Sequence, residues 1–334
     1  MNRERYTNLD GLRAYACIGI ILMHVESNGN YNLLGYIFTR IIPSFNDFVY
    51  LFMMISAFSL CCGYFDKFIN NSISLEQFYK KRYSRIWPFF ALFCTLELLI
   101  NFSINFVYEW FADLTLVFGL IPNHNIQVVG VGWFLGTIFA FYIFFPFFVF
   151  LISNKIRAWT AMCAVIILHY LCIVRFIAAA TRENIIFSGI FFLGGGLLYL
   201  YRNEYKKISI PMGIILMCII PFLYYFMRGD YVSLIIFSDM IVVCVSFNGT
   251  ISKIIFRNKV ILFVSSISME MYLCHMFVYR ALEKTDVMYM FDNQIINYMF
   301  DSIVTIIGAI ALAFFIKQVL HIINIQTKKL KHKL

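Results

Sequence analysis

The sequence predicts an all-α integral membrane protein with about ten transmembrane helices and both termini in the cytoplasm. The composition, the succession of apolar segments and the distribution of Lys and Arg carry this prediction. Of the 334 residues, 61% are hydrophobic and only 13% are charged, whereas about 25% of the residues in an ordinary soluble domain are charged. A bilayer can cover that much apolar surface, and a water-soluble core of this length cannot.

Ten segments have the length and apolar character of a membrane span, which needs about 20 predominantly apolar residues. They are approximately 10–28, 43–65, 87–107, 131–153, 158–178, 183–201, 208–226, 230–248, 259–281 and 297–323. A shorter apolar stretch at 110–121 predicts an interfacial or re-entrant helix. Because the segments follow one another along the chain, we expect a single transmembrane domain over 1–334 with no appended soluble domain.

The basic residues indicate the orientation of the ten spans. With both ends placed in the cytoplasm, only six of the 27 Lys and Arg residues fall outside, namely Arg40, Arg175, Arg182, Arg228, Arg280 and Lys284. An excess of Lys and Arg is typical of cytoplasmic loops, and an odd number of spans would abolish this excess. The net charge of +9 is explained in this way, so we expect the lipid bilayer as a partner and no nucleic acid.

Ionisable side chains inside a span indicate function because lipid does not solvate them. Arg13 and His24 are 11 residues apart in the first span, so they share one helix face and lie about 16 Å apart along its axis. Asp10, one turn before Arg13, is placed to pair with it. Alternatively, Arg13 extends to the lipid headgroups and His24 only packs against another helix.

The ninth predicted span carries a polar stripe of Ser268, Tyr272, His275 and Tyr279. Counted from the cytoplasmic ends of their spans, His275 and His24 reach a similar depth, about 21–24 Å. They could therefore meet in one cavity. A packing role for His275 stays open.

A basic amphipathic segment precedes the third span. Arg82 and Arg85 present two guanidinium groups on one side, which suits either a phosphate ligand or anionic lipid headgroups. Pro88 is placed to begin the third span.

Other polar or aromatic residues receive structural assignments. We expect His169 to be structural, Glu270 to lie on the face opposite the polar stripe, and Glu97 either to pair with a cation or to line a cavity. Trp133 and Tyr142 point about 180° apart around the axis of their helix, so they cannot both face one pocket. No Cys or His spacing predicts a metal site.

These residues resemble a known family, the membrane acyltransferase 3 family of bacterial O-acyltransferases. The family's opening pattern of Arg, ten residues and His falls on Arg13 and His24 in LDGLRAYACIGIILMH, and its RxxR element falls on Arg82 and Arg85 in FYKKRYSRIWP. Its late helix with Ser, Tyr and His resembles SISMEMYLCHMFV.

Three further segments are similar to the family in the expected order. LFMMISAFSL resembles its FF…SGF segment, with Ser56 and with Ala57 in place of Gly. GWFLGTIFAFYIFFP resembles its Trp…Tyr…Pro stretch on Trp133, and FFLGGGLLY resembles its FFLGAxxY helix. Ile138 stands where larger members have a Glu, so no catalytic role carries over to that position.

The resemblance implies an O-acyltransferase of a bacterial plasma membrane. It would transfer acetyl, or another acyl group, from acetyl-CoA as donor substrate to a hydroxyl of a cell-surface or exported carbohydrate or lipid-linked glycan. It assigns catalysis to His24, Arg13 and His275, acyl-CoA binding to Arg82 and Arg85, and supporting positions to Asp10, Ser56, Trp133 and Tyr272. The alternative is a multi-helix transporter that uses buried His and Arg as a substrate or proton relay.

Overall fold

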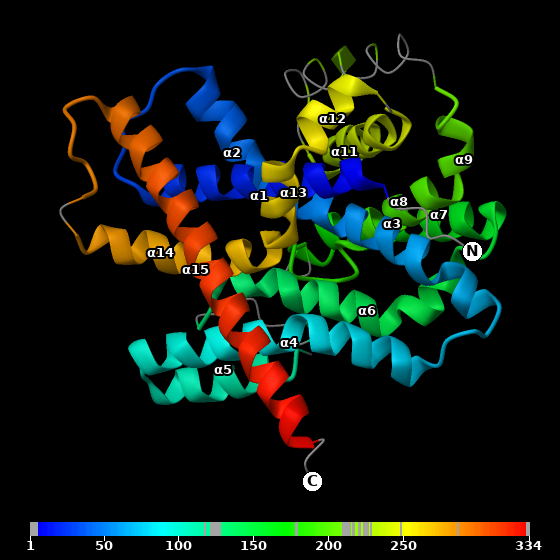
Figure 1. Ribbon diagram of the computed structural model, residues 1–334. Coiled ribbons are helices and arrows are strands. Elements are labelled where there is room, and N and C mark those ends of the chain that lie inside the picture. Colours follow the sequence, from blue (N-terminus) through cyan, green and yellow to red (C-terminus); the bar gives the residue numbers. More distant parts are fainter. Residues whose placement is uncertain are drawn as a thin grey trace.

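In the computed structural model the chain is helical, and the described residues contain no strand (Figure 1). Those residues are 6–116, 118–120, 128–177, 180–208, 229–247, 249–285 and 287–331, with a few single positions between 215 and 227. The helices that build the site are α1 (Thr7–Asn28), α3 (Phe48–Ile69), α4 (Leu75–Ile100), α6 (Trp133–Leu151) and α14 (Ser268–Glu283). The remaining α-helices are α2 (Ile42–Ser44), α5 (Ile104–Leu114), α7 (Lys155–Val174), α8 (Gly189–Leu200), α9 (Arg202–Tyr205), α11 (Asp230–Ser246), α12 (Thr250–Phe256), α13 (Lys259–Ser266) and α15 (Gln294–Lys331).

Several helices can cross a bilayer. Within the described residues, five segments are long and apolar enough: Ile37–Ile69, Leu75–Ile100, Gly130–Leu151, Lys155–Val174 and Gln294–Ile323. The pair α13 and α14, bent by 75°, makes a sixth if the two helices form one span. The structure therefore confirms the all-helical, multi-pass class.

Nine of the ten predicted spans coincide with helices, and the predicted span at 208–226 lies mostly outside the described residues. Helices at three predicted spans are neither among the five nor part of the bent pair. α1 carries Asp10, Arg13 and His24, which lower its mean hydropathy. The described helices α8 and α11 have only 12 and 17 residues.

The predicted limits of the third span, 87–107, are wrong, and so is the prediction that Pro88 begins it. A continuous helix runs from Leu75 to Ile100 with Pro88 inside it. The Ser74 hydroxyl accepts a hydrogen bond from the Gln77 amide (3.2 Å) and caps its first turn, which sets the start of the helix before the proline. Arg82 and Arg85 consequently belong to the spanning helix itself rather than to a separate segment.

The first helix lies at the centre of the bundle. α1 crosses the middle of the molecule and packs against α3, α11, α12, α13, α14 and α15 (Figure 1). Because neighbouring helices rather than lipid surround it, α1 can carry polar side chains on the face that borders internal cavities.

Close packing of α3 against α8 depends on a glycine. A Cβ atom at Gly195 would lie 2.2 Å from the backbone oxygen of Met54. We expect Gly195→Ala to push the two helices apart and to lower the thermal unfolding midpoint of the detergent-solubilised protein by several degrees. Gly249→Ala is the control, since a Cβ there meets nothing within 4 Å. Equal midpoints for the two variants would contradict this account of the packing.

Candidate active site

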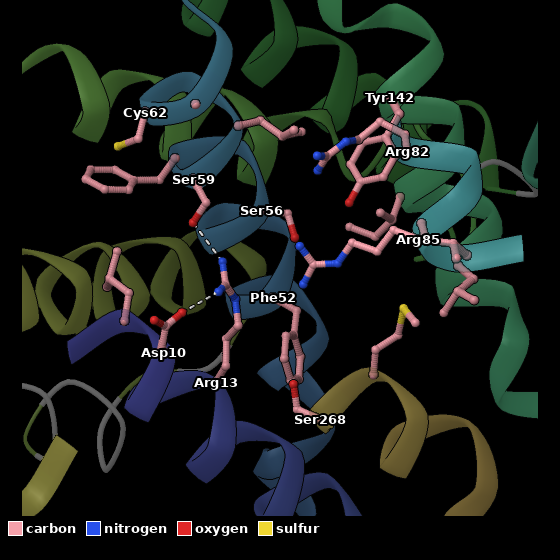
Figure 2. A pocket seen from close by; sticks show the side chains of 18 of the residues that line it. Asp10, Arg13, Phe52, Ser56, Ser59, Cys62, Arg82, Arg85, Tyr142 and Ser268 are labelled. Carbon is pink, nitrogen blue, oxygen red and sulfur yellow. Dashed lines mark hydrogen bonds and ion pairs between the residues drawn. The ribbon is translucent and has the colours of Figure 1, made fainter. Parts of the chain in front are cut away.

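A cavity of about 710 Å³ lies at the N-terminal end of α1, between α1, α3, α4, α6 and α14, and is called here the inner cavity (Figure 2). The charged side chains that line it are Asp10, Arg13, Arg82 and Arg85. Three guanidinium groups against one carboxylate make its electrostatic potential positive. A cavity of this kind favours an anionic ligand.

Arg13 is fixed within the inner cavity by hydrogen bonds to two helices. Its Nη1 donates to Asp10 Oδ1 at 2.9 Å, and its Nη2 donates to Ser59 Oγ on α3 at 2.7 Å (Figure 2). The pairing with Asp10 predicted from the sequence is confirmed. Arg13 therefore joins α1 to α3 at the wall of the cavity and does not extend freely toward lipid.

Arg82 and Arg85 line the same cavity, as their spacing on one helix face predicts. Arg82 donates from Nη2 to Tyr64 Oη at 2.7 Å. Its guanidinium carbon lies 5.0 Å from the centre of the Tyr64 ring and 5.9 Å from that of Tyr142, within the range of cation–π attraction. Arg85 is exposed and extends into the cavity in the direction of Ser56 (Figure 2).

A second cavity, of about 520 Å³, lies at the C-terminal end of α1 and is called here the outer cavity. His24 and Trp133 line it, together with the polar side chains of Glu26, Asn46 and Arg280. Aromatic, amide and charged groups around a space of this size form a surface that suits a polar, hydroxyl-bearing molecule.

The two cavities succeed one another along the same helices. α1 contributes Arg13 to the inner cavity and His24 to the outer one, and α14 contributes Tyr272 and then Met276. The 11-residue interval on α1 corresponds to about 16 Å along the helix axis.

The two histidines predicted to reach one depth are neighbours. The centres of the His24 and His275 rings are 5.1 Å apart, and their planes are inclined by 42°. His24 lines the outer cavity, whereas the His275 side chain is fully buried behind it. The sequence-based expectation that the two histidines could come together is confirmed, but they do not share a cavity, because His275 lies behind the wall that His24 forms.

Aromatic rings form part of the wall of the inner cavity and contact Trp133, which lines the outer cavity. The Phe134 ring centre lies 5.9 Å from that of Phe52, 5.4 Å from that of Tyr272 and 6.0 Å from that of Trp133. Phe52, Phe134 and Tyr272 line the inner cavity, while Trp133 lines the outer cavity. We call Phe52, Phe134 and Tyr272 the aromatic layer.

Trp133 and Tyr142 border different cavities, as their half-turn separation predicts. Glu97 is buried and its Oε1 lies 3.9 Å from Arg280 Nη1, so it pairs with a cation at the outer cavity. Glu270 lines neither cavity described here and lies 3.6 Å from Lys317, which agrees with its predicted position on the opposite face.

His169 lies apart from both cavities. It is fully buried, its ring is 4.1 Å from that of Phe187, and its Nδ1 lies 2.8 Å from the Phe187 carbonyl oxygen. The structural assignment agrees with these contacts.

Sequence reasoning missed Arg182, which contacts two residues that line the outer cavity. Arg182 donates to the side chain of Asn46 and lies over the Trp133 ring, 5.4 Å from its centre. It precedes α8 in a connecting segment, where no helical period could associate it with the histidines. The only sequence signal was a cation on the side of the membrane that has few of them.

A family model described as an acyltransferase domain matches residues 6–318, so this multi-pass membrane protein is an acyltransferase. The chain belongs to the acyltransferase 3 family, which the sequence motifs predicted. Comparison with curated proteins and with solved structures gives no match. Membership of this family favours an enzyme over the transporter alternative.

Proposed function

We propose that this acyltransferase transfers an acetyl group from acetyl-CoA to a hydroxyl group of a cell-surface or exported carbohydrate. The observation that carries the proposal is the succession of two cavities along α1, with arginines lining one and a histidine lining the other. A donor with phosphate groups fits the first, and a polyhydroxyl acceptor fits the second.

The proposed setting is a bacterial plasma membrane, crossed ten times by the chain with both termini in the cytoplasm. In this orientation Arg82 and Arg85 face the cytoplasm, where CoA thioesters occur, and His24 lies in the outer half of the bilayer. The bias of Lys and Arg in the sequence supports it.

The proposed donor site begins at the mouth of the inner cavity. Arg82 and Arg85 would bind the CoA phosphates, since guanidinium groups pair with phosphate oxygens through charge-assisted hydrogen bonds. The pantetheine arm would then pass Arg13 and Ser56 to bring the thioester to the aromatic layer. Arg13 would serve to orient the donor and to hold α1 against α3.

The proposed chemistry is general base catalysis by His24. A neutral His24 takes the proton of the acceptor hydroxyl while its oxygen attacks the thioester carbonyl carbon, and an oxyanion forms. When that oxyanion collapses, the carbon–sulfur bond breaks, and the CoA thiolate receives the proton from His24. Trp133 offers a ring face for the acceptor sugar.

Direct measurement tests the proposal. Membrane vesicles that contain the protein are incubated with radiolabelled acetyl-CoA and with envelope glycan of the source strain, freed of esters by mild alkali. We expect alkali-labile label in the glycan, and a deletion strain that lacks the corresponding ester. Release of label only as acetate, with an unchanged glycan in the deletion strain, would exclude this function.

The aromatic layer should keep water from the thioester. We expect Phe134→Ala to join the two cavities and to raise the ratio of acetyl-CoA hydrolysis to acetyl transfer by about 10-fold, because water then reaches the donor. Phe139→Ala is the matched control, since Phe139 is buried on the same helix and lines neither cavity described here. An unchanged ratio in Phe134→Ala would show that the layer is not the barrier.

A further inference from the structure

His275 is held in one orientation by its own helix. Its Nδ1 lies 2.6 Å from the carbonyl oxygen of Tyr272. Because a carbonyl oxygen can only accept a hydrogen bond, Nδ1 must carry the proton. In the neutral ring, Nε2 then has a lone pair and no hydrogen.

The free nitrogen of His275 is an acceptor without a donor. Nε2 is buried and has no hydrogen-bond partner among the described residues. A buried polar atom of this kind is uncommon and requires a physical explanation. The His24 ring, 5.1 Å away between centres, is the neighbouring group that can supply a donor.

The separation of the rings suits a hydrogen bond between them. An N–H···N bond of about 2.9 Å between two imidazoles places the ring centres about 5 Å apart, since each nitrogen lies near the rim of its ring. The observed 5.1 Å fits this value, and the 42° inclination of the planes excludes parallel stacking. In this structure the bond between the two rings is not formed, since His275 Nε2 has no hydrogen-bond partner among the described residues, but catalytic hydrogen bonds are often long before substrate binds.

We propose that His275 is a positioning residue whose Nε2 accepts a hydrogen bond from His24 and thereby fixes which nitrogen of His24 is free to act as the base. The inference rests on the proposed function. With one ring nitrogen of His24 protonated and bound to His275, the other nitrogen carries the lone pair and faces the outer cavity. An orienting partner for a catalytic histidine has the same physical role in other acyl-transfer enzymes.

Every proton in this arrangement is accounted for. The acceptor hydroxyl gives its proton to the free nitrogen of His24 as the oxygen–carbon bond forms. His24 is then an imidazolium whose other N–H still donates to His275. When the carbon–sulfur bond breaks, the same proton passes to the CoA thiolate, and His275 has neither gained nor lost one.

The geometry argues against two other roles for His275. It cannot donate to an oxyanion as a neutral ring, because its one N–H already binds the Tyr272 carbonyl. It cannot touch the acceptor directly, because its side chain is fully buried and lines neither cavity described here. The remaining role for His275 in the reaction is to act through its contact with His24.

Two substitutions test the proposal through kinetics. His275→Phe keeps the ring shape without an acceptor, whereas His275→Gln places an amide oxygen where it can replace Nε2. With radiolabelled acetyl-CoA and alkali-treated envelope glycan, we expect His275→Phe to lower kcat by about 10- to 30-fold with little change in the KM for acetyl-CoA. We expect His275→Gln to recover most of that loss. A His275→Phe enzyme with wild-type kcat, or a glutamine variant no better than phenylalanine, would overturn the proposal.

His169→Phe is the matched control, because His169 is equally buried and its Nδ1 also faces a carbonyl oxygen, that of Phe187. Amounts of folded protein are equalised by size-exclusion chromatography. If wild-type protein transfers no acetyl group, the proposed function fails, and a second measurement still decides the present inference.

That measurement is the nitrogen NMR spectrum of histidine-labelled protein in bilayers, which distinguishes protonated from unprotonated ring nitrogens. We expect His275 to carry its proton on Nδ1 and His24 to show a single tautomer. His275→Phe should change the His24 resonances, and His169→Phe should not. Identical His24 resonances in wild type and His275→Phe would refute the pairing whatever the activity.

Discussion

Replacing His24 by alanine is expected to lower acetyl transfer by about 10²- to 10⁴-fold, the usual contribution of a general base. The side chain lines the outer cavity, where the acceptor hydroxyl would lie, and the inner cavity has no contact with it. Donor binding should therefore persist. The measurement is the initial rate of label transfer from acetyl-CoA, together with the dissociation constant of acetyl-CoA for purified protein in detergent.

His169→Ala serves as the control for the loss of a buried imidazole, since its contacts are with Phe187, Asp230 and Tyr231, none of which lines either cavity described here. It should keep near wild-type transfer per folded molecule. A His24→Ala enzyme with near wild-type transfer would reject His24 as the base, whereas loss of both transfer and donor binding would indicate a damaged fold.

The position of Arg13 and His24 on one face of α1 could be predicted from the sequence because helical geometry is local. An interval of 11 residues fixes Arg13 and His24 on one side of the helix whatever surrounds it. The sequence also predicted a similar depth for His24 and His275, since the position of a residue within a span measures its depth, but it did not specify that the two helices are neighbours. The rings lie 5.1 Å apart even though the ninth predicted span is not one straight helix but the pair α13 and α14, bent by 75°.

The start of α4 could not be predicted from apolar length. Hydropathy marks the part of a helix that lies in lipid, whereas Ser74, a polar residue some distance before it, sets the helix start through a hydrogen bond to the Gln77 amide. Proline is tolerated inside a membrane helix because neighbouring groups satisfy the freed backbone atoms. Pro88 was therefore a poor indicator of a helix start.

The ion pairs and cation–π contacts between distant segments could not be predicted from the sequence. Glu97 was expected either to pair with a cation or to line a cavity, and only the structure identifies the cation as Arg280 from another helix. Arg82 makes cation–π contacts with Tyr64 and Tyr142, which belong to α3 and α6. Such contacts depend on helix packing, which a single sequence does not specify.

Removing both arginines of α4 is expected to raise the KM for acetyl-CoA by about 100-fold or more while kcat changes little. Arg82→Ala together with Arg85→Ala deletes two of the three guanidinium groups that line the inner cavity. Hydrogen bonds to charged groups contribute about 1.5–3 kcal/mol each, and the exposure of Arg85 places it toward the lower value. Because neither side chain reaches the outer cavity, the chemical step should be spared.

The matched control is Lys80→Ala with Lys81→Ala, which removes the same charge from the same helix at two exposed positions that do not line the inner cavity. If the arginines bind only anionic lipid, both double variants should have an unchanged KM and reduced binding to anionic vesicles. If the arginines bind the donor, only the arginine double variant should have a raised KM for acetyl-CoA. Its KM for a dephospho-CoA thioester should rise less, since that donor already lacks one phosphate group. An arginine variant with wild-type KM would remove the inner cavity as the donor site.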